Sequence, residues 1–204
     1  MKKKIRIRNK EELQDRKNCF LEICNILDQI NIKYFLQGGT LLGARRDKKF
    51  IEWDWDVEIS LFNNDLHKNF DIIISELLKN KFQIYACVND KISAKIDLYK
   101  NYDLDVTGYT IFGWSHDQKN QCYRRKKISF PDKFLENFQE IEFYGKTFNA
   151  PKPIDEYLSY QYGNWQVRKR TDDKEEYMTS NYYKRDNFLI KFVKTIVNNF
   201  RKKK

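Results

Sequence analysis

Residues 38–46 read GGTLLGARR, and residues 53–59 read WDWDVEI. Side chains in a β-strand alternate between two faces, so Asp54, Asp56 and Glu58 would share one face of a strand here. Three carboxylates on one face repel one another unless a cation lies among them. Mg²⁺ prefers such oxygen ligands and leaves room for substrate phosphates, so the pattern predicts a site for phosphoryl or nucleotidyl transfer.

The acidic stretch has a second interpretation, as a solvated edge strand kept charged to prevent aggregation. Lysine is the more usual residue at such an edge, and here Trp53 and Trp55 accompany the acids. A glycine-rich turn also comes shortly before the acids. We therefore favour the metal site.

The glycine-rich turn is a candidate phosphate site. Gly38 and Gly39 have no Cβ, which lets backbone N–H groups approach an anion, and Thr40 is expected to cap a helix that begins at Leu41. A tight turn without a ligand is the alternative, since glycine pairs are common. The Gly-Lys-Ser/Thr ending of a P-loop does not follow the pair.

Basic residues near the turn and later in the chain could contact phosphate. Arg45 and Arg46 could clamp a phosphate in bidentate fashion, although ordinary surface charge explains Arg45 equally well. The run YRRKK at residues 123–127 could also hold a substrate phosphate. A solvated face is the more usual role of such a run, and we favour it slightly.

A third carboxylate is expected from a strand next to the acidic one. Asp97 is the best candidate, because it interrupts the strand-like run AKIDLY at residues 94–99. Asp103 and Asp105 are competitors in a more loop-like stretch. A satisfied aspartate at a strand end is the alternative for Asp97.

Length and composition indicate one folded domain over residues 1–204. The 204 residues are 16% aromatic and 33% charged, which is typical of a globular protein rather than a disordered one. The net charge of +10 favours anionic partners such as nucleotides, phosphorylated sugars, nucleic acid or an anionic membrane.

The chain shows no sign of export. The basic start MKKKIRIR is not followed by the apolar segment of a signal peptide, and no apolar run is long enough to span a membrane. The four cysteines form no CxxC pair, so we expect reduced thiols rather than zinc ligands. These features predict a cytoplasmic protein.

Hydrophobic periodicity predicts an α+β fold. We expect helices over residues 11–30, 66–78 and 154–162, the last ended by Gly163. Strands are expected over residues 32–36, 50–61, 82–88, 92–99 and 106–112, with a hairpin over 142–149. Residues 114–127 are expected to be irregular, and residues 168–180 a charged linker. This irregular alternation favours a mixed β-sheet flanked by helices.

The C-terminal segment, about residues 187–204, has the pattern of a basic amphipathic helix. Packing of its apolar stripe on the domain is the more common role. Peripheral contact with an anionic membrane, at the inner face of the cell membrane, is the alternative.

Two segments resemble the LicD family, which includes bacterial phosphocholine transferases and the animal fukutin-related proteins. Residues 39–46 (GTLLGARR) and 50–59 (FIEWDWDVEI) are similar to the family pattern G-T-L-L-G-A-x-R, then F-I-P-W-D-x-D-[IV]-D-[IL]. Residues 143–165 are similar to its closing segment F-x-G…P…YL…YG-[DN]-W. Glu52 and Glu58 depart from the family's proline and aspartate.

The resemblance implies a nucleotidyltransferase-type fold and a Mg²⁺- or Mn²⁺-dependent transferase. Such an enzyme would move a phospho-alcohol group from a CDP-linked donor to a sugar hydroxyl of a surface glycan or glycolipid, with no nucleic acid partner. It implies Asp56, Glu58 and Asp97 as metal ligands and Asp54 as an accessory acid or base. The implied phosphate-binding residues are Gly38, Gly39, Thr40 and Arg46.

Two other functions remain open from the sequence. The first is a nucleotidyltransferase that adds NMP to a protein, an RNA or a small molecule. The second is a non-catalytic, membrane-associated partner in glycan assembly.

Overall fold

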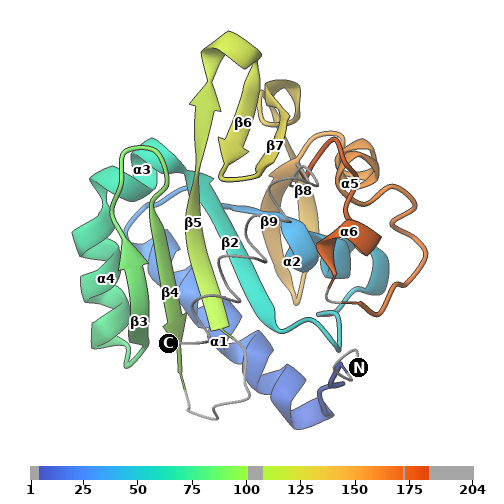
Figure 1. Ribbon diagram of the computed structural model, residues 1–204. Helices are drawn as coiled ribbons and strands as arrows, with labels where there is room; N and C mark the ends of the chain where they lie inside the picture. Colours follow the sequence, from blue (N-terminus) through green and yellow to red (C-terminus); the bar gives the residue numbers. More distant parts are fainter. Residues whose placement is uncertain (1–4, 101–107, 172, 184–204) are drawn as a thin grey trace, which may run out of the picture.

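The computed structural model describes residues 5–100, 108–171 and 173–183 (Figure 1). Within them, nine strands form one sheet with the order β3-β4-β5-β2-β1-β9-β8, and β6 and β7 extend from β5. The strands are β1 (Phe35–Leu36), β2 (Asp56–Phe62), β3 (Gln83–Val88), β4 (Lys95–Tyr99), β5 (Gly108–Asp117), β6 (Cys122–Arg125), β7 (Ile128–Pro131), β8 (Phe138–Phe143) and β9 (Lys146–Pro151). The α-helices are α1 (Lys10–Gln29), α2 (Gly38–Leu42), α3 (Asn63–Lys68), α4 (Phe70–Lys79), α5 (Ile154–Tyr162) and α6 (Lys174–Tyr177).

The sheet is mixed, which confirms the predicted α+β class. β2 pairs in parallel with β5, and β1 pairs in parallel with β9, whereas the other pairings are antiparallel. In Figure 1, α2, α5 and α6 lie to one side of β2, and β4 and β3 lie to the other. The acidic strand therefore runs through the middle of the sheet and is not an edge strand.

Helix α1 supports the segment that leads into β2. A capping box begins the helix, because Asn9 Oδ1 accepts from the Glu12 N–H and the Glu12 carboxylate accepts from the Asn9 N–H. On its buried face, the Phe20 ring lies 5.5 Å from the Phe50 ring and 5.4 Å from the Phe148 ring. This aromatic cluster anchors the chain just before the acids.

The acidic strand is shorter than predicted. Residues 50–55 are not part of β2, because the Asp54 N–H bonds to the Ile51 carbonyl and forms a turn. The Asp54 carbonyl accepts from Arg8 and, at 2.8 Å, from Arg16 Nη2. Both arginines are buried, so the turn is held from the α1 side.

Other local predictions need correction. The helix predicted over 66–78 is two helices, divided at Asn69, whose side chain donates to the Asp65 carbonyl at 2.8 Å. Residues 114–127, predicted to be irregular, contain the end of β5 and all of β6, because the buried Trp114 side chain keeps β5 in the core. The predicted linker 168–180 contains α6.

The hairpin and the end of α5 agree with prediction. Tyr144 and Gly145 both have positive φ at the β8–β9 turn, and Gly163 ends α5 with φ of 66°. The predicted helix over about 187–204 lies outside the described residues. Among the helices that are described, none is long and apolar enough to cross a membrane.

Candidate active site

Three carboxylates meet where the chain enters β2. Asp56 and Glu58 lie on β2, and Asp54 precedes it. Burial and the nearby Asp56 charge raise the pKa of Asp54 to about 7 and that of Glu58 to about 8. Burial also raises the pKa of Asp56. All three carboxylates are therefore more easily protonated than in water, chiefly because they are removed from solvent.

The glycine pair makes room for these carboxylates. A Cβ at Gly38 would lie within 3.0 Å of Glu58 Oε2, and a Cβ at Gly39 would lie equally close to Asp54 Oδ2. Gly38 also has φ of +61°. Thr40 does not cap a helix, because α2 begins at Gly38 and Thr40 Oγ1 accepts from the Glu58 N–H at 3.1 Å. The glycine turn and the acidic strand therefore form one unit.

A cavity of about 660 Å³ opens beside this unit. All three carboxylates line it, together with Gly39 and Arg46. Its opposite side comes from the later part of the chain, including Gln161, Tyr162, Trp165, Lys169, Lys174, Tyr177 and Tyr182. The volume is in the range of cavities that hold nucleotide-sized ligands.

Two cations face the carboxylates from outside the glycine turn. The guanidinium of Arg125 lies 3.9 Å from the centre of the Phe112 ring, and Arg125 and Lys174 both favour the charged form of Glu58. Lys174 comes from α6, where only a linker was predicted. The solvated face favoured for residues 123–127 is wrong for Arg125, which lines the cavity.

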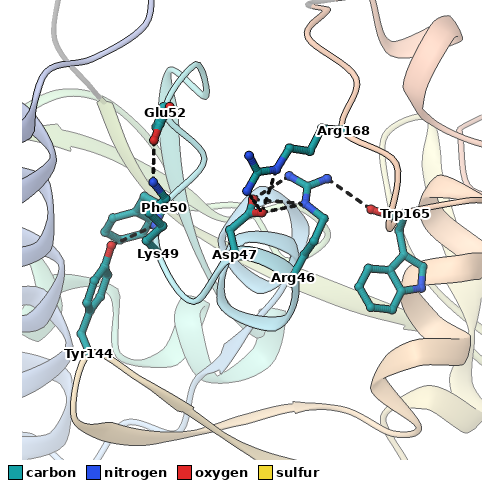
Figure 2. Close-up of polar contacts among 8 residues, drawn as sticks. All are labelled: Arg46, Asp47, Lys49, Phe50, Glu52, Tyr144, Trp165 and Arg168. Atoms are coloured by element: carbon teal, nitrogen blue, oxygen red, sulfur yellow. Dashed lines mark hydrogen bonds and ion pairs between the residues drawn. The ribbon is translucent and has the colours of Figure 1, made fainter.

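Arg46 is held at the cavity by a cluster of polar contacts that Figure 2 shows. Asp47 forms ion pairs of 2.8 Å with both Arg46 and Arg168, and Arg46 Nη1 donates to the Trp165 carbonyl at 3.2 Å. Burial would raise the pKa of Asp47, but the two arginines outweigh it and lower the pKa. Asp47 thereby joins the glycine-turn segment to the chain beyond α5.

The same view shows how the next residues are fixed. The Phe50 N–H donates to the Tyr144 hydroxyl at 2.9 Å, and Lys49 forms an ion pair of 2.5 Å with Glu52 (Figure 2). Glu52 occupies the position at which the resemblance led us to expect proline. Its side chain is thus part of a surface ion pair and not of the cavity.

Four predicted site residues do not line the cavity: Gly38 and Thr40, which support the acids from behind as described above, and Arg45 and Asp97. Arg45 makes a bidentate ion pair with the exposed Asp155, at 2.7 and 2.8 Å. Asp97 is in register with Thr110 of β5, which is itself in register with Glu58. Its carboxylate accepts from Thr110 Oγ1 at 2.7 Å and pairs with Lys95, and its role as a metal ligand stays a prediction.

The sequence of the chain matches known proteins over the same region. A family profile described as "LicD/FKTN/FKRP, nucleotidyltransferase domain" matches residues 31–153, more than half of the chain. The chain belongs to the LicD family. This agrees with the mixed sheet and with the resemblance of the glycine turn and the acidic stretch.

Curated relatives of this LicD-family chain are transferases by name. The mouse (Mus musculus) ribitol 5-phosphate transferase FKRP is 21% identical over 146 residues, 69% of this chain and 30% of the relative. The human (Homo sapiens) FKRP is 20% identical over the same length. The lipopolysaccharide cholinephosphotransferase LicD of Haemophilus influenzae is 35% identical over 51 residues, 25% of this chain and 19% of the relative. The chain therefore covers 30% of FKRP's length.

Sequence reasoning missed several residues of the cavity and of the Asp54 turn. Arg8 and Arg16 hold the Asp54 turn, but nothing in the sequence near them indicates a site. Trp165 could have been found, because it closes the second segment that resembles the family. Lys169 and Lys174 also line the cavity, but they were not predicted because the composition of residues 168–180 is that of a solvated linker.

Proposed function

We propose that this LicD-family protein transfers a phospho-alcohol group from a CDP-type donor to a sugar hydroxyl, with a divalent cation as cofactor. The observation that carries the proposal is the meeting of Asp54, Asp56 and Glu58 at a nucleotide-sized cavity with cationic side chains. The relatives' names, which refer to ribitol 5-phosphate and phosphocholine transfer, support this class of group.

The donor set suits Mg²⁺ or Mn²⁺. Among residues 5–100, 108–171 and 173–183, no group of three or more His, Cys, Asp or Glu side chains could hold a metal unaided. Mg²⁺ commonly takes only one or two carboxylates and completes its shell with water and substrate phosphates. Asp56 and Glu58, which both line the cavity, would supply those carboxylates. When bound, the ion would neutralise charge on the donor diphosphate.

The residues of the chain have distinct roles in the proposed reaction. Arg46, Arg125 and Lys174 would bind the diphosphate electrostatically. The acceptor oxygen forms a bond to the distal phosphorus, and the bond from that phosphorus to the bridging oxygen breaks. CMP leaves with the electron pair, and Asp54 would accept the proton of the acceptor hydroxyl.

Substitution of Asp56 tests the proposal. We expect Asp56→Ala and Asp56→Asn to abolish Mg²⁺-dependent release of CMP from CDP-choline or CDP-ribitol. Both variants should still unfold in a cooperative thermal transition, which shows that they are folded. Asp155→Asn is the matched control, because Asp155 is exposed and pairs with Arg45 outside the cavity. Full activity of Asp56→Ala would refute the assignment.

A further inference from the structure

Tyr85 is an exposed residue of β3 that lies close to the carboxylates. β3 shifts register with β4 between Ile84 and Ala86, so Tyr85 has no direct partner across the pair. Such a bulge redirects a side chain, and bulges are frequent next to active sites. The Tyr85 side chain is exposed, with 57% of its surface accessible, although it lies near the cluster of acids.

Tyr85 reaches across a position without a side chain. Gly108, the first residue of β5, is in register with Asp56, and a Cβ at Gly108 would lie 3.0 Å from the Tyr85 hydroxyl. Partial burial and the charges of Asp97 and Asp56 raise the pKa of Tyr85, which agrees with this placement. The Tyr99 ring lies 6.0 Å from the Tyr85 ring. Two tyrosine rings therefore form a shelf beside Asp56.

The shelf lies outside the cavity, on the strands next to β5. The cavity takes its lining from the N-terminal segment, the glycine turn, β2, β5, β6, β7, α5 and the chain after α5, and no residue of β3 or β4 lines it. In Figure 1, β3 and β4 lie on the side of β2 away from α2, α5 and α6. In phosphoryl transfer, the attacking and leaving oxygens are roughly in line with the phosphorus.

We propose that the Tyr85–Tyr99 shelf binds the acceptor sugar, with the Tyr85 hydroxyl contacting a sugar hydroxyl next to Asp56. This inference rests on the proposed function. An in-line acceptor attacks the phosphorus from the side opposite the leaving nucleotide, and the approach over β4 and β3 lies outside the cavity proposed for the nucleotide. Aromatic rings with a polar tip suit a sugar, whose faces are apolar and whose rim carries hydroxyls.

Binding and transfer are measured separately. Saturation-transfer NMR with methyl glycosides of galactose, glucose and N-acetylglucosamine needs no turnover. The second assay supplies CDP-choline, Mg²⁺ and the same glycosides, and compares phosphocholine-glycoside with free phosphocholine from hydrolysis. The variants are Tyr85→Ala and Tyr85→Phe, with Leu78→Ala as control because Leu78 is 53% exposed on α4.

We expect Tyr85→Ala to lose the NMR signal and to lower the ratio of transfer to hydrolysis about tenfold. Tyr85→Phe should keep part of the binding and lose part of the ratio, and Leu78→Ala should change neither. An absent signal with wild-type protein, or equal signals and ratios for wild type and Tyr85→Ala, would overturn the inference. Absence of CMP release from wild type would instead reject the proposed function, and the NMR result would still decide the shelf.

Discussion

The carboxylate of Glu58 lies against the backbone of Gly38, in the space that a Cβ at that position would fill. Gly38 begins α2 with φ of +61°, and Glu58 lies on β2, so two segments twenty residues apart in the sequence depend on each other's geometry. The relationship explains why a glycine turn and an acidic strand occur together. It also leads to the first prediction.

Gly38→Ala should abolish activity, because the new Cβ would displace the Glu58 carboxylate. Donor-dependent CMP release measures the effect. Gly145→Ala is the control, since Gly145 also has positive φ (79°) but nothing lies within 4 Å of its added Cβ. Both variants should lose about 1–2 kcal/mol of stability to backbone strain, but only Gly38→Ala should lose activity. An active Gly38→Ala enzyme would mean that Glu58 is not needed in its present position.

The stability of the metal-free protein should fall as pH rises. The pKa values of Asp54 (about 7) and Glu58 (about 8) are raised in the folded state, so the folded state holds protons that the unfolded state has released. Stability from these groups is complete below their unfolded pKa values and is lost as pH rises through the folded ones. Melting temperatures in chelator at about pH 5.5 and about pH 8.5 measure this loss, and Mg²⁺ should reduce it.

Glu58→Gln removes one of these partly buried charges without changing the size of the side chain. We expect the variant to be more stable than wild type in chelator at about pH 8.5, because the cost of burying the charge is gone. CMP release should be lost in the same variant. A melting temperature that stays below that of wild type at this pH would show that the Glu58 charge is compensated within the protein.

Asp47 should control the position of Arg46 and of the segment beyond α5. Asp47→Asn removes the charge that pairs with Arg46 and Arg168, both at 2.8 Å. We expect the KM for the CDP donor to rise about tenfold with little change in kcat, because Arg46 would no longer be held at the cavity. Asp132→Asn, which removes a partly exposed carboxylate paired with His116, should leave both constants unchanged.

A comparison of two arginines, one in the cavity and one outside it, tests whether the cavity binds the donor. Arg125→Met should weaken binding of the CDP donor, because Arg125 lines the cavity and stacks on Phe112. Arg45→Met should not, because Arg45 is paired with Asp155 outside it. Calorimetric titration with CDP-choline and Mg²⁺ compares the two. Equal losses in both variants would contradict the assignment of the cavity as the donor site.

The sequence pattern correctly predicted features of the fold that are determined by residues close together in the sequence. Period-two alternation correctly placed Asp56 and Glu58 on one strand, and positive-φ preferences correctly placed the turn at Tyr144 and Gly145. Asp54 was assigned to the same strand because the pattern continues through it. Its turn is set by Arg8 and Arg16, which are distant in the sequence.

Contacts between distant segments could not be read from the sequence. The pairing of Arg45 with Asp155 spans 110 residues and takes that arginine away from the cavity. Lys174 lies in a hydrophilic stretch that has no apolar periodicity, so its place opposite Glu58 follows only from the fold. Neither the Arg45–Asp155 pairing nor the position of Lys174 could therefore be predicted from motifs or composition.

The most direct measurement is hydrolysis of CDP-choline in ¹⁸O-labelled water, with Mg²⁺ and no sugar. Water then replaces the acceptor, and the label marks the phosphorus that is attacked. Attack at the distal phosphorus places ¹⁸O in phosphocholine and leaves CMP unlabelled, which is the result that we predict, and Asp56→Asn should give neither product. Label in CMP would show attack at the nucleotide phosphorus and would contradict phospho-alcohol transfer in favour of nucleotidyl transfer.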